Sequence, residues 1–134
     1  MKNILHVEDD ALIVHIYRPA LERAGFRVEV AEDGVIAAKM LFKAKPDLVV
    51  LDLLMPKLAG TDVIKFIRSR PNLQSLPVIV LSQASIADQG VTAAALGADR
   101  IFYKSQCTPA ILISAIHELL CPAPENPMPA PPGG

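Results

Sequence analysis

Two short, wholly apolar runs constrain the fold of this chain more than any other feature. Residues 48–51 (Leu-Val-Val-Leu) and 78–81 (Val-Ile-Val-Leu) contain no polar side chain, which is typical of strands buried on both faces of a sheet. A longer segment before them places apolar residues in adjacent pairs four positions apart, at 12/13, 16/17 and 20/21. That spacing indicates an amphipathic helix. Strands that alternate with helices predict a parallel sheet with helices on both faces.

The alternation continues along the chain and predicts an α/β fold of five strand–helix units. Strands are expected at residues 4–7, 27–31, 48–51, 78–81 and 100–103, and the second is polar enough to lie at an edge. Helices are expected at residues 11–24, 34–45, 60–68, 85–97 and from 109 onward. The last of these begins with Thr108-Pro109, a strong N-cap and first-turn pair.

Composition indicates one globular domain followed by a tail. The 134 residues are 51 % hydrophobic and 20 % charged, as expected of a packed domain. Residues 121–134 hold half of the twelve prolines and almost no large apolar side chain. We therefore expect a domain at residues 1–121 and a proline-rich flexible tail or linker at 122–134.

Charge and hydropathy argue against several classes of function. A net charge of −1 gives no basic footprint for direct nucleic-acid binding. No apolar run approaches the ~20 residues that cross a membrane, and the amino terminus lacks an apolar leader. Cys107 and Cys121 have neither a metal-ligand nor a redox spacing. These features favour a cytoplasmic protein with reduced thiols.

Polar residues follow four of the five predicted strands. Glu8 and Asp9 follow the first, Asp52 the third, Ser82 the fourth and Lys104 the fifth. The carboxyl ends of parallel strands meet at one edge of a sheet, where ligands bind. The doubly wound order 2-1-3-4-5, taken from known folds rather than derived from these residues, would make the first and third strands neighbours.

This set of residues suits phosphoryl transfer to a carboxylate. Carboxylates packed closely repel one another, and a hard cation with oxygen ligands, such as Mg²⁺, relieves that repulsion. Lys104 and Ser82 could then bind phosphoryl oxygens. Taken singly, each residue has a plainer interpretation: Asp10 is expected to cap the following helix, and Lys104 alone would be an ordinary surface charge. Their joint placement carries the hypothesis.

Several segments resemble the receiver domains of bacterial response regulators. They are residues 4–10 (Ile-Leu-His-Val-Glu-Asp-Asp), 51–56 (Leu-Asp-Leu-Leu-Met-Pro) with Gly60, Leu81-Ser82 and 102–104 (Phe-Tyr-Lys). The similarity covers about residues 2–120 and implies a flavodoxin-like fold with the strand order given above. It implies a signalling module in a two-component phosphorelay, which is not an enzyme beyond catalysing its own phosphorylation and dephosphorylation.

Carried over position by position, the resemblance implies a role for each site residue. Asp52 would be the phosphoacceptor, and Ser82 and Lys104 would hold the phosphoryl oxygens. Asp9, Asp52 and the backbone carbonyl of Leu54 would bind Mg²⁺, with Glu8 acting directly or through a water. The donor would be a histidine kinase or a phosphotransfer protein. The output face would comprise the fourth and fifth helices and the fifth strand. It would contact an unknown downstream protein or a second copy of the domain in a homodimer.

The chain departs from the family pattern at several positions. Ile101 stands where an aromatic switch residue is usual, and a β-branched side chain cannot repeat its large rotation. Ser105 replaces a proline, and a cis peptide bond there would be costly. Gln83 could narrow access to Ser82. Leu54 and Ala84 supply no polar group to orient water, so we expect a long-lived phosphoryl state.

Three alternatives remain. A pseudo-receiver would bind a partner without phosphorylation, and Ile101 and Ser105 favour it slightly. A phosphatase of the Asp-x-Asp type would need a second aspartate where Leu54 stands. A flavin carrier would need a glycine- and threonine-rich phosphate loop that the sequence lacks.

Overall fold

Every strand expected from the sequence is present in the computed structural model, which describes residues 1–53, 58–82 and 97–120. The strands are β1 (Asn3–Val7), β2 (Arg27–Ala31), β3 (Leu48–Leu51), β4 (Val78–Ser82) and β5 (Arg100–Tyr103). All of them pair in parallel, in the order β2-β1-β3-β4-β5. The predicted strand order and the predicted edge position of β2 are therefore confirmed.

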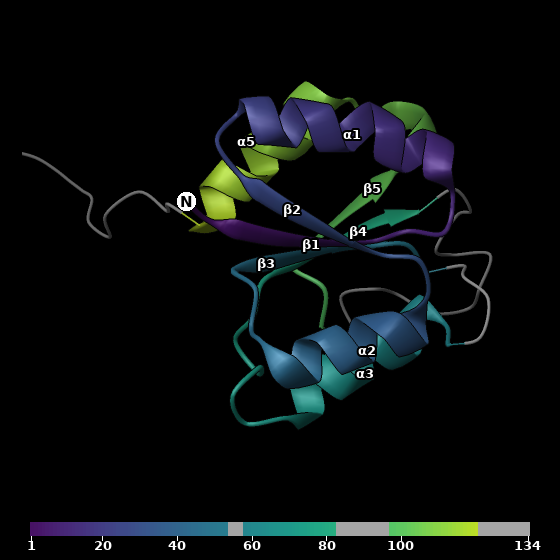
Figure 1. Ribbon diagram of the computed structural model, residues 1–134, viewed down its shortest axis with the longest axis vertical. Helices are drawn as coiled ribbons and strands as arrows, with labels where there is room; N and C mark the ends of the chain where they lie inside the picture. Colours follow the sequence, from purple (N-terminus) through teal and green to yellow (C-terminus); the bar gives the residue numbers. More distant parts are fainter. Residues whose placement is uncertain (54–57, 83–96, 121–134) are drawn as a thin grey trace, which may run out of the picture.

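Within the described residues, four α-helices cover the two faces of the sheet. They are α1 (Ala11–Arg23), α2 (Gly34–Lys43), α3 (Gly60–Ser69) and α5 (Pro109–Leu120). Figure 1 shows α1 and α5 on one face and α2 and α3 on the other. The helix expected at 85–97 and the tail expected at 122–134 lie outside the described residues. No helix within the described ranges is both long and apolar enough to cross a membrane.

Polar side chains at the helix starts explain where α2 and α5 begin. Asp33 Oδ1 accepts a hydrogen bond from the Ile36 backbone amide at 2.8 Å, and Thr108 Oγ1 accepts one from Ile111 at 3.2 Å. Each of these caps satisfies one of the amide groups that the first turn leaves without a helical partner. The predicted start of α5 at Thr108-Pro109 is confirmed.

Alternate residues of each strand contribute to two separate cores, as the period of a strand requires. Leu5, Val49 and Leu51 pack toward α2 and α3, with Val63 and Ile64 of α3. The opposite core lies against α1 and α5 and contains buried side chains from the sheet and from both of these helices: Ile4, Val50, Ile79, Tyr17, Leu21, Leu112 and Ile116. The predicted covering of both sheet faces is thus confirmed.

The apolar pairs of α1 are not buried as pairs. Tyr17 and Leu21 are buried, whereas Leu12 is 65 % exposed and Ile16 is 46 % exposed. An α-helix buries a stripe of its surface, so two adjacent residues, which lie about 100° apart, seldom both face the sheet. The pairs correctly located the helix but overstated the width of its buried face.

Candidate functional site

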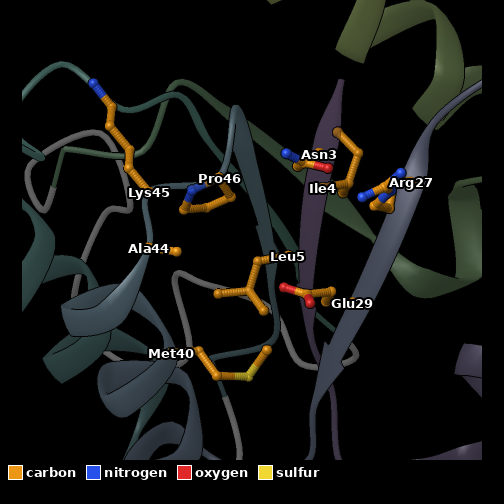
Figure 2. A pocket seen from close by; sticks show the side chains of 9 residues that line it. All are labelled: Asn3, Ile4, Leu5, Arg27, Glu29, Met40, Ala44, Lys45 and Pro46. Atoms are coloured by element: carbon orange, nitrogen blue, oxygen red, sulfur yellow. The ribbon is translucent and has the colours of Figure 1, made fainter. Parts of the chain in front are cut away.

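The described surface has hollows at both ends of the sheet. The hollow at the amino ends of the strands is lined by few side chains that could react or bind a metal. It measures about 200 Å³ and lies between β1, β2 and the end of α2. In Figure 2 Leu5 and Met40 face each other across it, with Glu29 beside them. Glu29 is the one carboxylate among its lining residues. Ligands of parallel sheets bind at the opposite, carboxyl ends, so this hollow is a poor candidate for the functional site.

The sheet itself positions two acidic residues at the carboxyl edge. Val7 and Leu51 are register partners in β1 and β3, and Glu8 and Asp52 directly follow them. The Glu8 amide donates to the Ala31 carbonyl at 2.9 Å, and the Asp52 amide donates to the Val7 carbonyl at 3.1 Å. Both backbones therefore remain within the hydrogen-bonded ladder and carry their side chains to the same edge.

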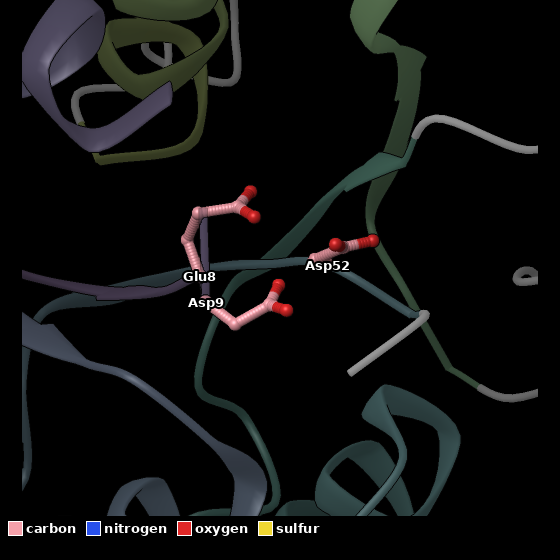
Figure 3. A group of neighbouring side chains, drawn as sticks. All are labelled: Glu8, Asp9 and Asp52. Carbon is pink, nitrogen blue, oxygen red and sulfur yellow. The ribbon is translucent and has the colours of Figure 1, made fainter. Parts of the chain in front are cut away.

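Three carboxylates meet at this edge. Glu8, Asp9 and Asp52 each offer an oxygen atom, and the three atoms lie within 4.8 Å of one another. Figure 3 shows the Glu8 and Asp9 side chains extending from the end of β1 toward the side on which Asp52 lies. Glu8 and Asp52 are buried, whereas Asp9 is exposed. The donor set is all oxygen and is open to solvent on one side, which suits Mg²⁺.

Lys104, which directly follows β5, extends its side chain into the same group. Its Nζ lies 2.9 Å from Glu8 Oε1 and 3.2 Å from Asp52 Oδ2, and it donates a hydrogen bond to Glu8 Oε2 at 3.1 Å. Only 10 % of the lysine side chain is exposed. The ammonium group is thus a nearly buried positive charge held between two carboxylates.

Burial and the contact between Glu8 and Lys104 act in opposite directions on the pKa of each group. Desolvation, together with the negative charge of Asp52, raises the pKa of Glu8 to about 7, although Lys104 acts to lower it. Desolvation alone would lower the pKa of Lys104, but its contacts with Glu8 and Asp52 raise it above its ordinary value. Lys104 therefore stays protonated at neutral pH, and Glu8 titrates near neutrality.

Ser82 supplies a buried hydroxyl at the carboxyl end of β4. The residue is fully buried, and its Oγ has no hydrogen-bond partner among the residues that the structure describes. A buried hydroxyl without a partner costs free energy. Ser82 could therefore donate to a ligand oxygen bound at this edge.

Gly60 allows α3 to begin against the backbone of Asp52. A Cβ atom at Gly60 would collide with the Asp52 carbonyl oxygen and crowd the Cα of Leu53. The Gly60 amide also donates to the Leu53 carbonyl at 3.0 Å. Because only glycine fits here, the chain just after Asp52 is held close to the start of α3.

The third acidic residue after β1 has the structural role expected of it. Asp10 Oδ1 accepts from the Leu12 amide at 2.9 Å and caps α1. Its own amide donates to Glu8 Oε2 at 3.2 Å. Asp10 therefore orients α1 and Glu8 instead of joining the group of possible metal ligands.

Sequence reasoning missed a buried imidazole behind the site. His6 is buried, and its ring meets Tyr17 edge-on at a centroid distance of 6.4 Å. The Tyr17 hydroxyl in turn donates to the Cys107 carbonyl at 2.9 Å. Burial, and secondarily the charge of Lys104, lowers the pKa of His6 to about 4. The only signal in the sequence was a polar residue inside an otherwise apolar strand.

The structure also describes two of the departures from the family pattern. Ile101 packs against the core beneath α2 and α3, and Phe102 packs against the opposite core, so the predicted opposite orientation of these neighbours is confirmed. The peptide bond between Lys104 and Ser105 is trans. Leu54, with its predicted carbonyl ligand, and Gln83 and Ala84 lie outside the described residues.

Comparison with known proteins identifies the family. A family model described as the response regulator receiver domain matches residues 4–117. The response regulator MprA of Mycobacterium leprae is 38 % identical over 96 residues, which are 72 % of this chain and 41 % of that protein. The chain thus spans about two fifths of the length of the curated relatives that it matches.

Solved structures agree in fold. The receiver domain of a signal transduction histidine kinase from Syntrophus aciditrophicus is 28 % identical, with a TM-score of 0.84 and coverage of 97 % of this chain and 98 % of that one. The phosphorylated cyanobacterial phytochrome response regulator RcpA is 28 % identical, with a TM-score of 0.79 and coverage of 90 % and 94 %. The Mn²⁺-bound response regulator Rcp1 is 25 % identical, with a TM-score of 0.78 and coverage of 97 % and 100 %.

The fold and the acidic edge define a flavodoxin-like signalling domain of the two-component type. The chain belongs to the response-regulator receiver family. Receiver domains are signalling domains and are generally not enzymes, and the cluster of Glu8, Asp9 and Asp52 fits the Mg²⁺ site of such a domain.

Proposed function

We propose that this receiver domain accepts a phosphoryl group on Asp52 from a histidine kinase or phosphotransfer protein, with Mg²⁺ as cofactor. One observation carries the proposal: the nearly buried Lys104 ammonium lies 3.2 Å from Asp52 Oδ2, beside a group of three carboxylates. Such a pairing puts a nucleophile, a positive charge and metal ligands in one place. The relatives known in phosphorylated and Mn²⁺-bound forms support it.

Residues of this chain would hold the cation without rearranging the sheet. Asp9 and Asp52 would bind it directly, Glu8 directly or through a water, and the Leu54 carbonyl would complete the set. The cation, when bound, supplies positive charge that offsets the repulsion between an anionic donor and an anionic acceptor. The short distances among the three carboxylates are consistent with this role.

The transfer itself replaces one bond to phosphorus by another. An oxygen of the Asp52 carboxylate bonds to phosphorus as the bond from phosphorus to the donor histidine nitrogen breaks, and the histidine is released. Lys104 would hold one phosphoryl oxygen, and the Ser82 hydroxyl would donate to another.

Phosphorylation would shift the segments that follow Ser82 and Lys104. Drawing both groups toward a new charge of about −1.5 to −2 would shift the face formed by β5, α5 and the helix expected at 85–97. That face would contact the downstream protein or a second copy of the domain. Ile111, exposed on α5, would contribute to it. We place the domain at residues 1–121, with 122–134 as tail, in the cytoplasm.

Intact-mass analysis after incubation with acetyl phosphate tests this function. We expect the wild type to gain one phosphoryl group with Mg²⁺, and no gain with a chelator present. Asp52→Ala should gain none, whereas the matched variant Asp62→Ala, at an exposed aspartate of α3, should behave as the wild type. Absence of the adduct in the wild type with both acetyl phosphate and a cognate kinase would instead favour a pseudo-receiver, for which Ile101 is the motivating residue.

A further inference from the structure

The outer surface of α2 and α3 carries an exposed aromatic side chain that the fold does not use. Phe42 is 69 % exposed, although it is among the largest apolar residues of α2. It borders a hollow of about 360 Å³ between the two helices, lined by Ala38, Lys39, Phe42, Lys43 and Phe66. Together with Arg70, these residues are named the α2–α3 patch. Exposed apolar surface rimmed by charge is characteristic of interaction sites.

Charge is strongly segregated onto this part of the chain. Residues 34–45 and 60–70 contain six cationic side chains and one acidic side chain, Asp62, for a net charge of +5. The cations are Lys39, Lys43, Lys45, Lys65, Arg68 and Arg70. Since the whole chain carries −1, the remaining residues carry −6. The α2–α3 patch itself holds three of these cations, Lys39, Lys43 and Arg70, and no acidic side chain, so it is a positive region on an otherwise negative protein.

Arg70 links the apolar and the charged parts of the patch. Its guanidinium carbon lies 5.1 Å from the centre of the Phe42 ring and 5.3 Å from that of Phe66. Both distances are within the range of cation–π attraction. The contact holds two rings from different helices beside one fixed cation, so the patch is ordered before any partner arrives.

The α2–α3 patch is remote from the phosphorylation chemistry. Helix α3 begins at Gly60 against the Asp52 backbone, and Phe66 lies six residues later, about 9 Å along the axis. Arg70 follows the end of the same helix. Nothing in the patch contacts Glu8, Asp52 or Lys104 in the described interactions.

We propose that the α2–α3 patch docks an acidic segment of a separate partner protein, with an aromatic or large aliphatic side chain inserted between Phe42 and Phe66, whether or not Asp52 is phosphorylated. Lys39, Lys43 and Arg70 would pair with the carboxylates that flank that side chain. A short segment can cover these three cations without meeting the net negative charge of the rest of the chain, whereas a long polyanion or an anionic vesicle would be repelled by that negative charge. This inference goes beyond the proposed function and does not depend on it.

The test is a titration of the full ¹⁵N-labelled chain, followed by amide chemical shifts, with a short synthetic peptide of glutamates around one phenylalanine. We expect saturable shifts confined to residues 38–43 and 66–70. Phe42→Ala should weaken binding by about tenfold, as loss of a central aromatic contact does, and Lys39→Glu with Lys43→Glu should abolish it. Leu12→Ala, which removes an equally exposed apolar side chain on α1, and Asp52→Ala should both bind as the wild type.

Three results would overturn the proposal. One is the absence of saturable shifts in the α2–α3 patch. Another is equal binding by Phe42→Ala, or by a peptide with alanine in place of phenylalanine. The third is tighter binding to a thymidine oligonucleotide, or to phosphatidylcholine–phosphatidylserine vesicles, than to the peptide. Since Asp52→Ala is included, failure here is distinguishable from failure of phosphorylation.

Discussion

Two clusters of polar groups at opposite ends of the sheet are built on different principles. Near the amino ends of β4 and β5, Arg68 donates to the carbonyls of Gly97, Gln74 and Leu76 and to Asp99, at 2.6–3.2 Å. At the carboxyl ends, Lys104 is surrounded by carboxylates that lie close to one another. The Arg68 cluster pairs one cation mainly with neutral acceptors, whereas the Lys104 cluster concentrates negative charge.

The difference separates polar groups that stabilise the fold from polar groups that would bind a ligand in the proposed function. Asp99 also accepts from the Val78 amide at 2.8 Å, so the Arg68 cluster ties α3 to the start of β4 and to the segment before β5. In the Lys104 cluster, burial and like charges keep the pKa of Glu8 high, and the Ser82 hydroxyl lacks a partner among the described residues. A cluster that a cation and a phosphoryl group would complete is the expected state of a switch before it is loaded.

The largest expected effect on stability lies in the Arg68 cluster. Arg68→Ala should lower the free energy of unfolding by about 3 kcal/mol, because three carbonyls, two of them in partly buried hydrogen bonds, lose a charged donor at once. Arg18→Ala removes an arginine whose ion pair with Glu22 is about half exposed and should cost less than about 0.5 kcal/mol. Urea denaturation of the two variants measures both losses in the free energy of unfolding. Equal losses would contradict the structural role given to the Arg68 cluster.

The buried imidazole should make stability depend on pH. The folded pKa of His6 is lowered from 6.5 to about 4, so the unfolded chain binds a proton first as the pH falls. The contribution of His6 to the free energy of unfolding is present above pH 6.5 and is lost as the pH falls toward 4. About 2 kcal/mol of it is lost between pH 6.5 and 5.

The effect of Glu8 on the pH dependence of stability has the opposite sign. Because its pKa is raised, Glu8 contributes stability that is present below pH 4.5 and is lost as the pH rises toward 7. The difference between the wild type and His6→Leu therefore isolates the imidazole. Denaturation curves at several pH values should show that the free energy of unfolding falls more between pH 6.5 and 5 for the wild type than for His6→Leu. Parallel curves would refute the assignment of a neutral, buried His6.

A smaller effect is expected from the cation. At a Mg²⁺ concentration about ten times its dissociation constant, the free energy of unfolding should rise by about 1.4 kcal/mol. Asp9→Asn should lose most of this gain, because it removes one carboxylate of the group of three. Asp10→Asn, which keeps a side-chain oxygen able to cap α1, is the control and should retain it. A gain that survives in Asp9→Asn would place the cation elsewhere.

The smallest effect is expected at Asp52, the proposed acceptor. Asp52→Asn removes repulsion among the carboxylates but also weakens the contact with Lys104, which keeps its 2.9 Å contact with Glu8. Without Mg²⁺ the net change should stay below about 1 kcal/mol. The same variant should lower the pKa of Glu8, because Asp52 is one of the charges that raise it. Carboxyl carbon shifts in an NMR titration would detect this change.

The sequence predicted the edge of the sheet well, because strand ends can be located from apolar runs. Asp52 follows four buried residues, and Glu8 and Asp9 follow another buried run, so their meeting required only the strand order. The contact of Lys104 with Glu8 was not predicted. It spans 96 positions and depends on how far a long side chain reaches across β4, which no local pattern encodes.

The Arg68 cluster and the α2–α3 patch were missed for a related reason. Arg68 looks like an ordinary basic residue in the last turn of a helix, and its acceptors are carbonyls that the sequence does not distinguish. Phe42 falls at a position that apolar periodicity leaves undecided, and only its neighbour Leu41 is buried. Side-chain direction around a helix decides such cases, and it depends on packing with the neighbouring layer.

Chemical location of the phosphoryl group tests the central claim most directly. Protein treated with acetyl phosphate and Mg²⁺ would be reduced with borohydride, which converts an aspartyl phosphate into homoserine, and the peptides would be read by mass spectrometry. We predict homoserine at position 52 and nowhere else, and none when Mg²⁺ is chelated. Homoserine at position 9, or unmodified aspartate at 52 in protein that had gained the phosphoryl mass, would contradict the assignment of Asp52.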